Sequence, residues 1–158
     1  MAKFEIRLAR TDEIPLLAGI YQRAIERSCA PWYSSRQLSA WLGFSADAGL
    51  WQDSFQQTHC LVAVNKQDVP LAFGDMHPGT GQIGRLYVEP DAQGNGLGTA
   101  ILKELELLLQ HAGHNEAALE SALNAYRFYL NRGYSSLGTV TLPFNGELFT
   151  QYRMLKQW

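Results

Sequence analysis

The segment LYVEPDAQGNGLGTAILKELELLL, residues 86–109, contains the pattern that decides the fold. It begins with strand-forming residues, and Pro90 ends this strand because proline has no N–H to donate to a β-ladder. Three glycines follow at positions 94, 96 and 98, and beyond them apolar residues recur at helical spacing as far as Leu109. The segment therefore predicts a strand, a tight glycine-rich turn and a long amphipathic helix.

The glycine-rich turn has the local properties of a phosphate-binding site. Gly94, Gly96 and Gly98 have no Cβ, so a ligand can approach their backbone closely. The free N–H groups at the start of the helix carry a partial positive charge, which favours an anion. The spacing GxGxG differs by one residue from the dinucleotide-binding fingerprint, and the Gly-Lys-Ser/Thr of a Walker loop is absent. On the glycines alone, a turn without a ligand fits equally well.

Upstream of the turn, the hydrophobic pattern predicts a strand followed by a helical region. The strand covers residues 4–8, and a helix follows over residues 14–25. A second helix begins near Ser34, where Ser34 and Gln37 form a capping box. Residues 43–57 are polar and uneven, which indicates a loop with one short helix.

The rest of the chain alternates between strands and helices. Strands at 61–64, 71–74 and 83–88 are separated by turns and predict an antiparallel meander. Beyond the long helix, the pattern predicts a strand at 117–121, a helix at 125–132 ended by Gly133, and closing strands at 140–142 and 148–155. The fourth and fifth strands flank a helix, so they can run parallel through a right-handed crossover. The order predicts an α/β fold with a mixed sheet and helices on both faces.

The bulk composition fits a single globular domain covering residues 1–158. The formal net charge is −2, so no basic surface for nucleic acid or for a membrane is expected. Cys29 and Cys60 are far apart and show no metal-ligand spacing, which favours free thiols in a reducing cytosol. We therefore expect a cytoplasmic protein without metal, nucleic-acid or membrane partners.

The segment around the glycines resembles the signature of the GNAT acetyltransferase superfamily. That signature has a strand ending near V-x-P, then Q/R-x-x-G-x-G/A, then a helix, and Gln93, Gly96 and Gly98 occupy its three defining positions. Further along, Asn124-Ala125, Phe128-Tyr129 and Gly133-Tyr134 resemble the family's second motif, and residues 152–156 resemble its closing strand. The second motif often has Asn three residues before its Ala, where this chain has Ala122.

The resemblance implies the fold and the cofactor site. The sheet would be mostly antiparallel, with splayed parallel fourth and fifth strands. Acetyl-CoA would be the cosubstrate, with its pyrophosphate on the glycine turn and its pantetheine arm along the fourth strand. The implied cofactor-binding residues are Leu86, Tyr87, Val88, Gln93, Gly94, Asn95, Gly96, Leu97, Gly98, Thr99, Asn124 and Tyr129. For Asn124, a role as a helix N-cap is favoured over the pantetheine contact, and the two roles are compatible.

The resemblance also implies direct transfer of the acetyl group to an amine within a ternary complex. Tyr129 would protonate the leaving thiolate, or would only hydrogen-bond the sulfur. Glu120 is the first choice for the base that takes the proton of the amine, because burial on a strand makes a carboxylate more basic. Asp75, Glu89, His77 and a chain of waters are alternatives. Each of these carboxylates also fits a solvated or ion-paired surface role.

The acceptor site is expected between the first two helices and the loop after them, in the region of Arg23, Glu26, Arg27, Trp32, Tyr33 and Trp41. A small-molecule or peptide amine fits this mixture of charges and aromatic rings. A non-catalytic acyl-CoA sensor or regulatory module is the alternative function, and an interaction protein on the same fold is the third. An apolar patch from Phe144, Leu148, Phe149 and Tyr152 would support a homodimer.

Overall fold

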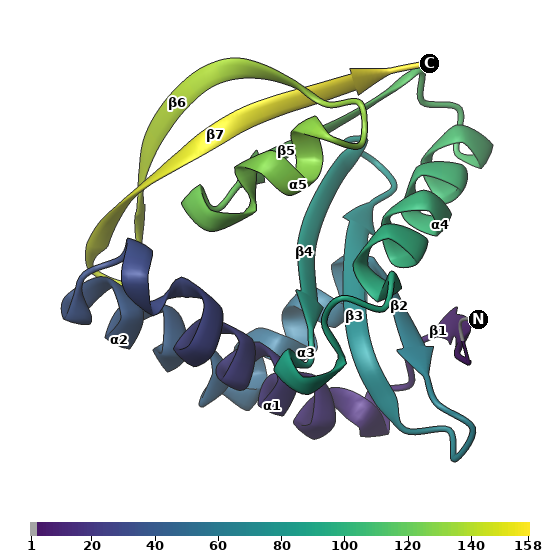
Figure 1. Ribbon diagram of the computed structural model, residues 1–158, viewed down its shortest axis with the longest axis horizontal. Helices are drawn as coiled ribbons and strands as arrows, with labels where there is room; N and C mark the ends of the chain where they lie inside the picture. Colours follow the sequence, from purple (N-terminus) through teal and green to yellow (C-terminus); the bar gives the residue numbers. More distant parts are fainter. Residues whose placement is uncertain (1–2) are drawn as a thin grey trace.

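The computed structural model describes residues 3–158, and the seven strands of that part form one mixed sheet (Figure 1). The strands are β1 (Glu5–Leu8), β2 (His59–Val64), β3 (Pro70–His77), β4 (Gln82–Val88), β5 (Glu116–Ser121), β6 (Ser135–Phe144) and β7 (Glu147–Gln157). They lie in the order β1-β2-β3-β4-β5-β7-β6. The predicted antiparallel meander of β2, β3 and β4 is confirmed. β7 lies between β5 and β6, because β6 and β7 form a hairpin whose second strand pairs with β5.

The parallel strands β4 and β5 diverge after a short contact. In residues 3–158 they are joined by one residue pair, Gln82 of β4 with Ala118 of β5. The rest of β4, residues 83–88, pairs with β3 on one side and with no described strand on the other. The expected splayed pair within a mostly antiparallel sheet is therefore confirmed. It leaves a free backbone edge on β4.

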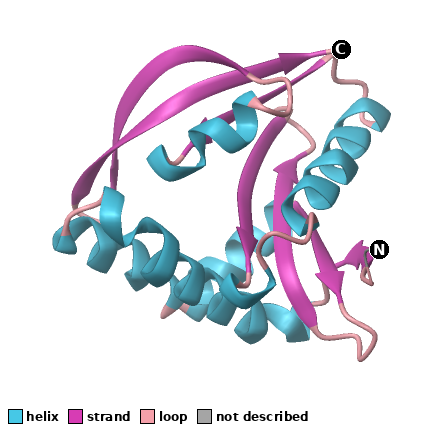
Figure 2. Cartoon of the chain, viewed as in Figure 1, coloured by secondary structure: helices cyan, strands magenta, loops and turns pink. Residues whose placement is uncertain are grey.

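Helices cover both faces of the sheet, as predicted (Figure 2). One face carries α4 (Leu97–His111) and α5 (Tyr126–Leu130), and the other carries α1 (Ile14–Ala24), α2 (Ser35–Ser45) and α3 (Ala48–Gln57). The short turns are η1 (Thr11–Glu13), the π-helical η2 (Ile25–Cys29), η3 (Ala30–Trp32), η4 (Pro90–Ala92) and η5 (Leu123–Ala125). Each face has its own hydrophobic core.

α4 packs tightly on the sheet through the stripe that its sequence predicts. The buried apolar residues of the helix are Leu97, Ile101, Leu102, Leu105 and Leu109. Gly74 of β3 lies beneath them, and a Cβ at this position would come within 2.9 Å of Ile101 and 3.0 Å of Leu86. The missing side chain lets the helix approach the sheet closely. This contact holds the start of α4 beside the free edge of β4.

The region after the second helix differs from the prediction of a loop with one short helix. α3 covers ten residues of it, from Ala48 to Gln57. The Asp47 carboxylate accepts a hydrogen bond from the Leu50 backbone N–H at 3.1 Å and caps the helix, while Trp51 is fully buried beneath it. The buried Trp51, the partly buried Phe55 and the cap stabilise a helix that is otherwise mostly polar.

The predicted capping box at the start of α2 is confirmed. The Gln37 backbone N–H donates to Ser34 Oγ at 3.1 Å, and the Ser34 backbone N–H donates to Gln37 Oε1 at 2.9 Å. These two bonds satisfy donors that a helix leaves free at its N-terminus. The start of α2 is therefore set by its local sequence.

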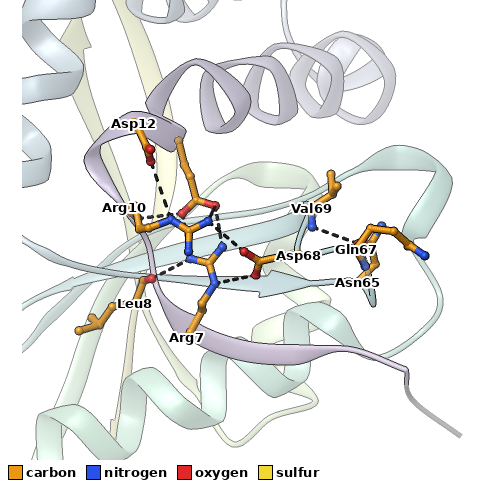
Figure 3. Close-up of polar contacts among 9 residues, drawn as sticks. Arg7, Leu8, Arg10, Asp12, Asn65, Gln67, Asp68 and Val69 are labelled. Carbon is orange, nitrogen blue, oxygen red and sulfur yellow. Dashed lines mark hydrogen bonds and ion pairs between the residues drawn. The ribbon is translucent and has the colours of Figure 1, made fainter.

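A polar network ties β1 to η1 and to the β2–β3 turn (Figure 3). Arg7 donates two hydrogen bonds to the buried carboxylate of Glu13, at 2.9 and 2.7 Å, and a third to Asp68 at 3.1 Å. Arg10 also donates to Asp68, at 2.9 Å. The hydrogen bonds from Arg7 are the main cause that lowers the pKa of Glu13 below its ordinary value of 4.5, against the opposing effect of burial.

The residues expected to form an apolar patch for a homodimer are divided between core and surface. Phe149 is buried and Tyr152 is half-buried, whereas Leu148 and Phe144 are exposed near the hairpin turn. Cys29 and Cys60 are free, as expected, and both are buried. No helix within residues 3–158 is both long and apolar enough to cross a membrane.

Candidate active site

A cleft of about 1090 Å³ lies where β4 and β5 diverge. Its lining comes from the glycine-rich turn, the free edge of β4, the segment from β5 to α5, the first two helices and the β6–β7 hairpin. Most of the residues predicted for cofactor binding and catalysis meet here, although they are distant in the chain. The arrangement has room for an extended ligand with groups of different chemistry at its two ends.

The glycine turn places the start of α4 at this cleft with its backbone uncovered. Gly94 and Gly96 have φ values of 82° and 81°, a left-handed conformation that favours glycine. No side chain caps α4, and the N–H groups of Leu97, Gly98 and Thr99 lie in its first turn, where no intrahelical acceptor exists. A Cβ at Gly94 or Gly96 would meet no atom within 4 Å. The N-terminus of α4 is therefore open to an anion.

Ion pairs fix the turn against the helices on the other side. Arg23 of α1 donates to both oxygens of Glu89, at 2.7 and 2.8 Å, and Arg27 of η2 donates to Asp91 at 3.0 Å. Gln93 lies in the cleft lining, and its Nε2 donates to Ser28 at 3.3 Å. The predicted acceptor-site residues Arg23 and Arg27 thus support the turn and do not line the cleft.

One predicted cofactor residue points away from the cleft. Asn95 folds back so that its Nδ2 donates to the Ala92 carbonyl at 3.0 Å, and it is absent from the lining that its neighbours Gly94 and Gly96 join. Its side chain stabilises the shape of the turn. Gly98 and Thr99 lie in the lining, as predicted.

Arg132 is a functional candidate that the sequence did not reveal. Its Nε donates to Thr99 Oγ1 at 2.8 Å, its Nη1 donates to the Phe128 carbonyl at 2.8 Å, and its guanidinium lies 3.8 Å from the centre of the Phe128 ring. These contacts hold a positive charge beside the open end of α4. The only sequence signal was a basic residue just before Gly133, which by itself indicates no ligand.

Leu86, Tyr87 and Val88 of β4 all belong to the cleft lining. The Tyr87 ring packs against Tyr21 and Phe73, with ring centres 5.0 and 5.7 Å apart. Leu86 and Val88 face the opposite core under α4. The side chains of these residues are therefore engaged in packing, and their backbone groups form the edge that faces the opening.

Tyr129 reaches the cleft from α5 and is nearly buried. Its ring makes edge contacts with Phe128 and Tyr134, at centre distances of 5.1 and 5.5 Å. Burial raises the pKa of its phenol well above the ordinary value of 10.0, and the negative charge of Asp75 adds to this effect. The hydroxyl is therefore protonated at neutral pH and can donate a hydrogen bond.

Asn124 lies within η5 and caps no helix, so the favoured role as an N-cap was wrong. The N-cap of η5 is Ala122, and Ala125 precedes α5 without a side-chain cap. Asn124 Oδ1 is buried without a hydrogen-bond partner in the described chain, and the residue lines the cleft. The side chain also lies against Cys29, whose pKa burial raises to about 11, an effect that contact with Asn124 opposes.

The three carboxylates considered as bases have different environments. Asp75 is buried and accepts hydrogen bonds from the backbone N–H and Nε of Arg85, at 2.7 and 2.8 Å. Glu89 is bound by Arg23. Glu120 is half-buried on β5, lines the cleft and forms no ion pair within residues 3–158. His77 also lines the cleft.

Aromatic side chains dominate the cleft where α2 meets the β6–β7 hairpin. Trp32, Tyr33 and Trp41, predicted for the acceptor site, all line it. Phe44 of α2 and Phe144 of the hairpin join them. Among the described residues, no group of three or more His, Cys, Asp or Glu side chains is arranged to hold a metal ion.

Comparison with known proteins agrees with this geometry. Residues 29–156 match the acetyltransferase (GNAT) domain. The chain is 24% identical over 155 residues to the uncharacterised N-acetyltransferase YafP of Escherichia coli K12. The aligned region covers 98% of this chain and 96% of YafP. A crystal structure of a GCN5-related N-acetyltransferase from Rhodopseudomonas palustris superposes with a TM-score of 0.94 at 28% identity, over 100% of this chain and 98% of that one.

A second solved structure, the PaiA N-acetyltransferase from Thermoplasma acidophilum in complex with coenzyme A, has a TM-score of 0.78 at 17% identity and covers both chains fully, at 100% each. At this identity the likeness concerns the fold. The domain match covers most of the chain and includes the glycine turn, β4, β5 and α5. The protein therefore belongs to the GNAT family of acetyltransferases.

Proposed function

We propose that this acetyltransferase takes the acetyl group from acetyl-CoA and transfers it directly to a primary amine bound in the same cleft. The observation that carries the proposal is the uncapped N-terminus of α4, which opens beside the free edge of β4. The helix N-terminus suits a pyrophosphate, and the free strand edge suits an amide-bearing chain. The relative from Thermoplasma acidophilum, solved with coenzyme A, supports this choice of ligand.

The pyrophosphate binds the backbone N–H groups of the glycine turn. Gly96 and Gly98 leave the backbone accessible, and the dipole of α4 favours the negative charge. Arg132, held beside Thr99, adds a charged donor to the same region. The pantetheine arm then lies along β4, where backbone groups of residues 86–88 have no strand partner towards β5 among the described residues.

The reaction joins the amine nitrogen to the acetyl carbon and breaks the bond from that carbon to sulfur. A backbone N–H near Val88 polarises the thioester carbonyl, a contact worth about 3 kcal/mol in the barrier when well aligned. Tyr129 donates its proton to the leaving thiolate, and Glu120 removes a proton from the incoming ammonium. The position of the protonated Tyr129 in the cleft lining, and the lack of an ion pair at Glu120 among the described residues, support these two roles.

Calorimetric titration of acetyl-CoA into the purified protein tests the cofactor site. Gly96→Glu should abolish binding, because the new carboxylate would project into the open space assigned to the pyrophosphate. Gly113→Glu is the matched control: Gly113 also has a positive φ, of 93°, with no atom within 4 Å of its Cβ position, but lies at the far end of α4. Equal affinity of folded Gly96→Glu and the control would overturn the assignment.

A further inference from the structure

The cleft ends in a continuous aromatic wall, which we call the aromatic pocket, formed by Tyr33, Trp41, Phe44, Phe144 and Phe149. The ring of Trp41 contacts Tyr33 and Phe149, with centres 5.1 and 5.8 Å apart. Phe144 contacts Phe44 and Phe149, with centres 6.2 and 6.0 Å apart. Tyr33 and Phe149 are buried behind the surface, whereas Trp41 and Phe44 are half-buried and Phe144 is exposed. The pocket thus presents ring faces and edges to the cleft.

Hydrogen bonds hold these rings in place before any ligand arrives. The hairpin is attached to α2 through Gln37 Nε2, which donates to the Leu148 carbonyl at 2.8 Å, and through Asn145 Nδ2, which donates to the Ala40 carbonyl at 2.9 Å. The Tyr33 hydroxyl accepts from the Leu123 backbone N–H at 2.8 Å. A preformed pocket of this kind binds an apolar group with little ordering cost.

The charges on the cleft lining leave one free carboxylate near the acceptor. Asp75 and Arg85 form an ion pair at 2.7 Å, with Arg85 Nη1 left buried and without a hydrogen-bond partner in the described chain, and Arg132 donates to Thr99 at the phosphate end. Glu120 remains. Arg153 lies opposite Glu120 in the β5–β7 register, but it is exposed, does not line the cleft and forms no ion pair within the described residues.

This charge pattern discriminates among amines. An acceptor with its own carboxylate or phosphate would bring a second negative charge to a cleft that already holds Glu120, and Arg85 of the same lining is already paired with Asp75, so such a buried charge is costly. A polyamine has no apolar body to displace water from the aromatic pocket, and its additional ammonium groups would share a single carboxylate. An aromatic ring that carries one ammonium on a short chain can place the ring in the aromatic pocket and the ammonium near Glu120.

We propose that the acceptor is a primary amine joined by a short alkyl chain to an aromatic ring. The ring fills the aromatic pocket, and the ammonium lies towards Glu120. This inference rests on the proposed acetyl transfer for its chemistry, but the binding preference can be measured without any turnover.

The direct test is calorimetry on protein saturated with CoA, which carries no acetyl group to transfer. The probes are phenethylamine, L-phenylalanine and spermidine: the second adds a carboxylate to the first, and the third replaces the ring by further amines. We expect phenethylamine to bind at least about tenfold more tightly than either of the others. Equal or tighter binding of L-phenylalanine or spermidine would overturn the proposal.

Variants then locate the bound ring. Trp41→Ala, and independently the exposed Phe144→Ala, should each weaken phenethylamine binding about tenfold. Trp158→Ala is the control, because Trp158 donates to the His114 carbonyl and does not line the cleft. Unchanged affinity in both pocket variants would show that the ring does not bind there.

Turnover separates the two proposals. If acetyl-CoA is consumed with other amines but phenethylamine does not bind, the transfer reaction stands and the aromatic pocket is refuted as its acceptor site. If phenethylamine binds as predicted but no acetylated product forms from acetyl-CoA by mass spectrometry, the pocket stands and the proposed transfer is refuted.

Discussion

The carboxylate of Asp75 is held by Arg85 through both its backbone and its side chain, at 2.7 and 2.8 Å. Each Asp75 oxygen therefore accepts a hydrogen bond from Arg85. Glu89 is engaged in the same way by Arg23. These two arginines engage two of the three carboxylates, and Glu120 is the one that forms no ion pair within residues 3–158.

Glu120→Gln should therefore lower kcat/KM about 100-fold, because the amide cannot accept the proton of the amine. Binding of acetyl-CoA, measured by calorimetry, should stay unchanged. Glu104→Gln, on the exposed side of α4, is the control and should keep full activity. If Glu120→Gln is as active as the control, proton removal falls to His77 or to water.

Tyr129→Phe should lower kcat about 100-fold, because the leaving thiolate loses its proton donor. The affinity for acetyl-CoA should change far less than kcat, since the ring and its contacts with Phe128 and Tyr134 remain. Tyr126→Phe provides a matched control: Tyr126 lies on the same helix but packs against Tyr152, outside the cleft lining. Equal kcat in the two variants would remove the Tyr129 hydroxyl from the mechanism.

Arg132→Met should weaken acetyl-CoA binding about tenfold, because a charged donor at the phosphate end is lost. The loss should shrink as salt concentration rises, since salt screens the interaction in the wild type. Arg36→Met, at an exposed position of α2, removes the same charge away from the cleft and should have no effect. An equal affinity of both variants would assign Arg132 to packing on Phe128 alone.

Glu13→Gln should lower the free energy of unfolding at pH 7 by about 2 kcal/mol, because Arg7 loses charged hydrogen-bond acceptors. The pKa of Glu13 is lowered in the folded protein from 4.5, so its stabilising effect is present above pH 4.5 and is lost as the pH falls through the folded value. Urea unfolding should therefore show the gap between wild type and variant narrowing below pH 4.5. A constant gap, or the same loss in the exposed control Glu5→Gln, would contradict this account.

The sequence predicted those parts of the fold that depend on local pattern. The stripe of α4, the capping box of Ser34 and Gln37, and the glycine turn are all determined by residues close together in the chain. The length of α3 was underestimated because its many polar residues hide the periodicity, and the helix is anchored by the buried Trp51 with the partly buried Phe55 beside the same core. The position of β7 between β5 and β6 depends on strand pairing, which hydrophobic alternation does not encode.

The candidate site shows the same division between local and distant effects. The residues of the turn and Tyr129 could be named because a short motif contains them. The hydrogen bonds from Arg85 to Asp75 could not be predicted, because a register shift in the β3–β4 pairing brings Arg85 to the Asp75 carboxylate. The contact of Arg132 with Thr99 joins positions 33 residues apart, and only the packing of α5 against α4 creates it.

The β6–β7 hairpin ends in the turn Asn145-Gly146, where both residues have positive φ values, 50° and 86°. Hairpins of this kind tolerate changes at their tip without loss of strand pairing. Residues 142–144, beside this turn, form one side of the cleft, and the glycine turn forms another. The two ends of the cleft can therefore change independently in evolution. Descendants of one ancestral enzyme could therefore exchange the amine that they accept by remodelling the hairpin, while the machinery for the shared acyl donor is inherited unchanged.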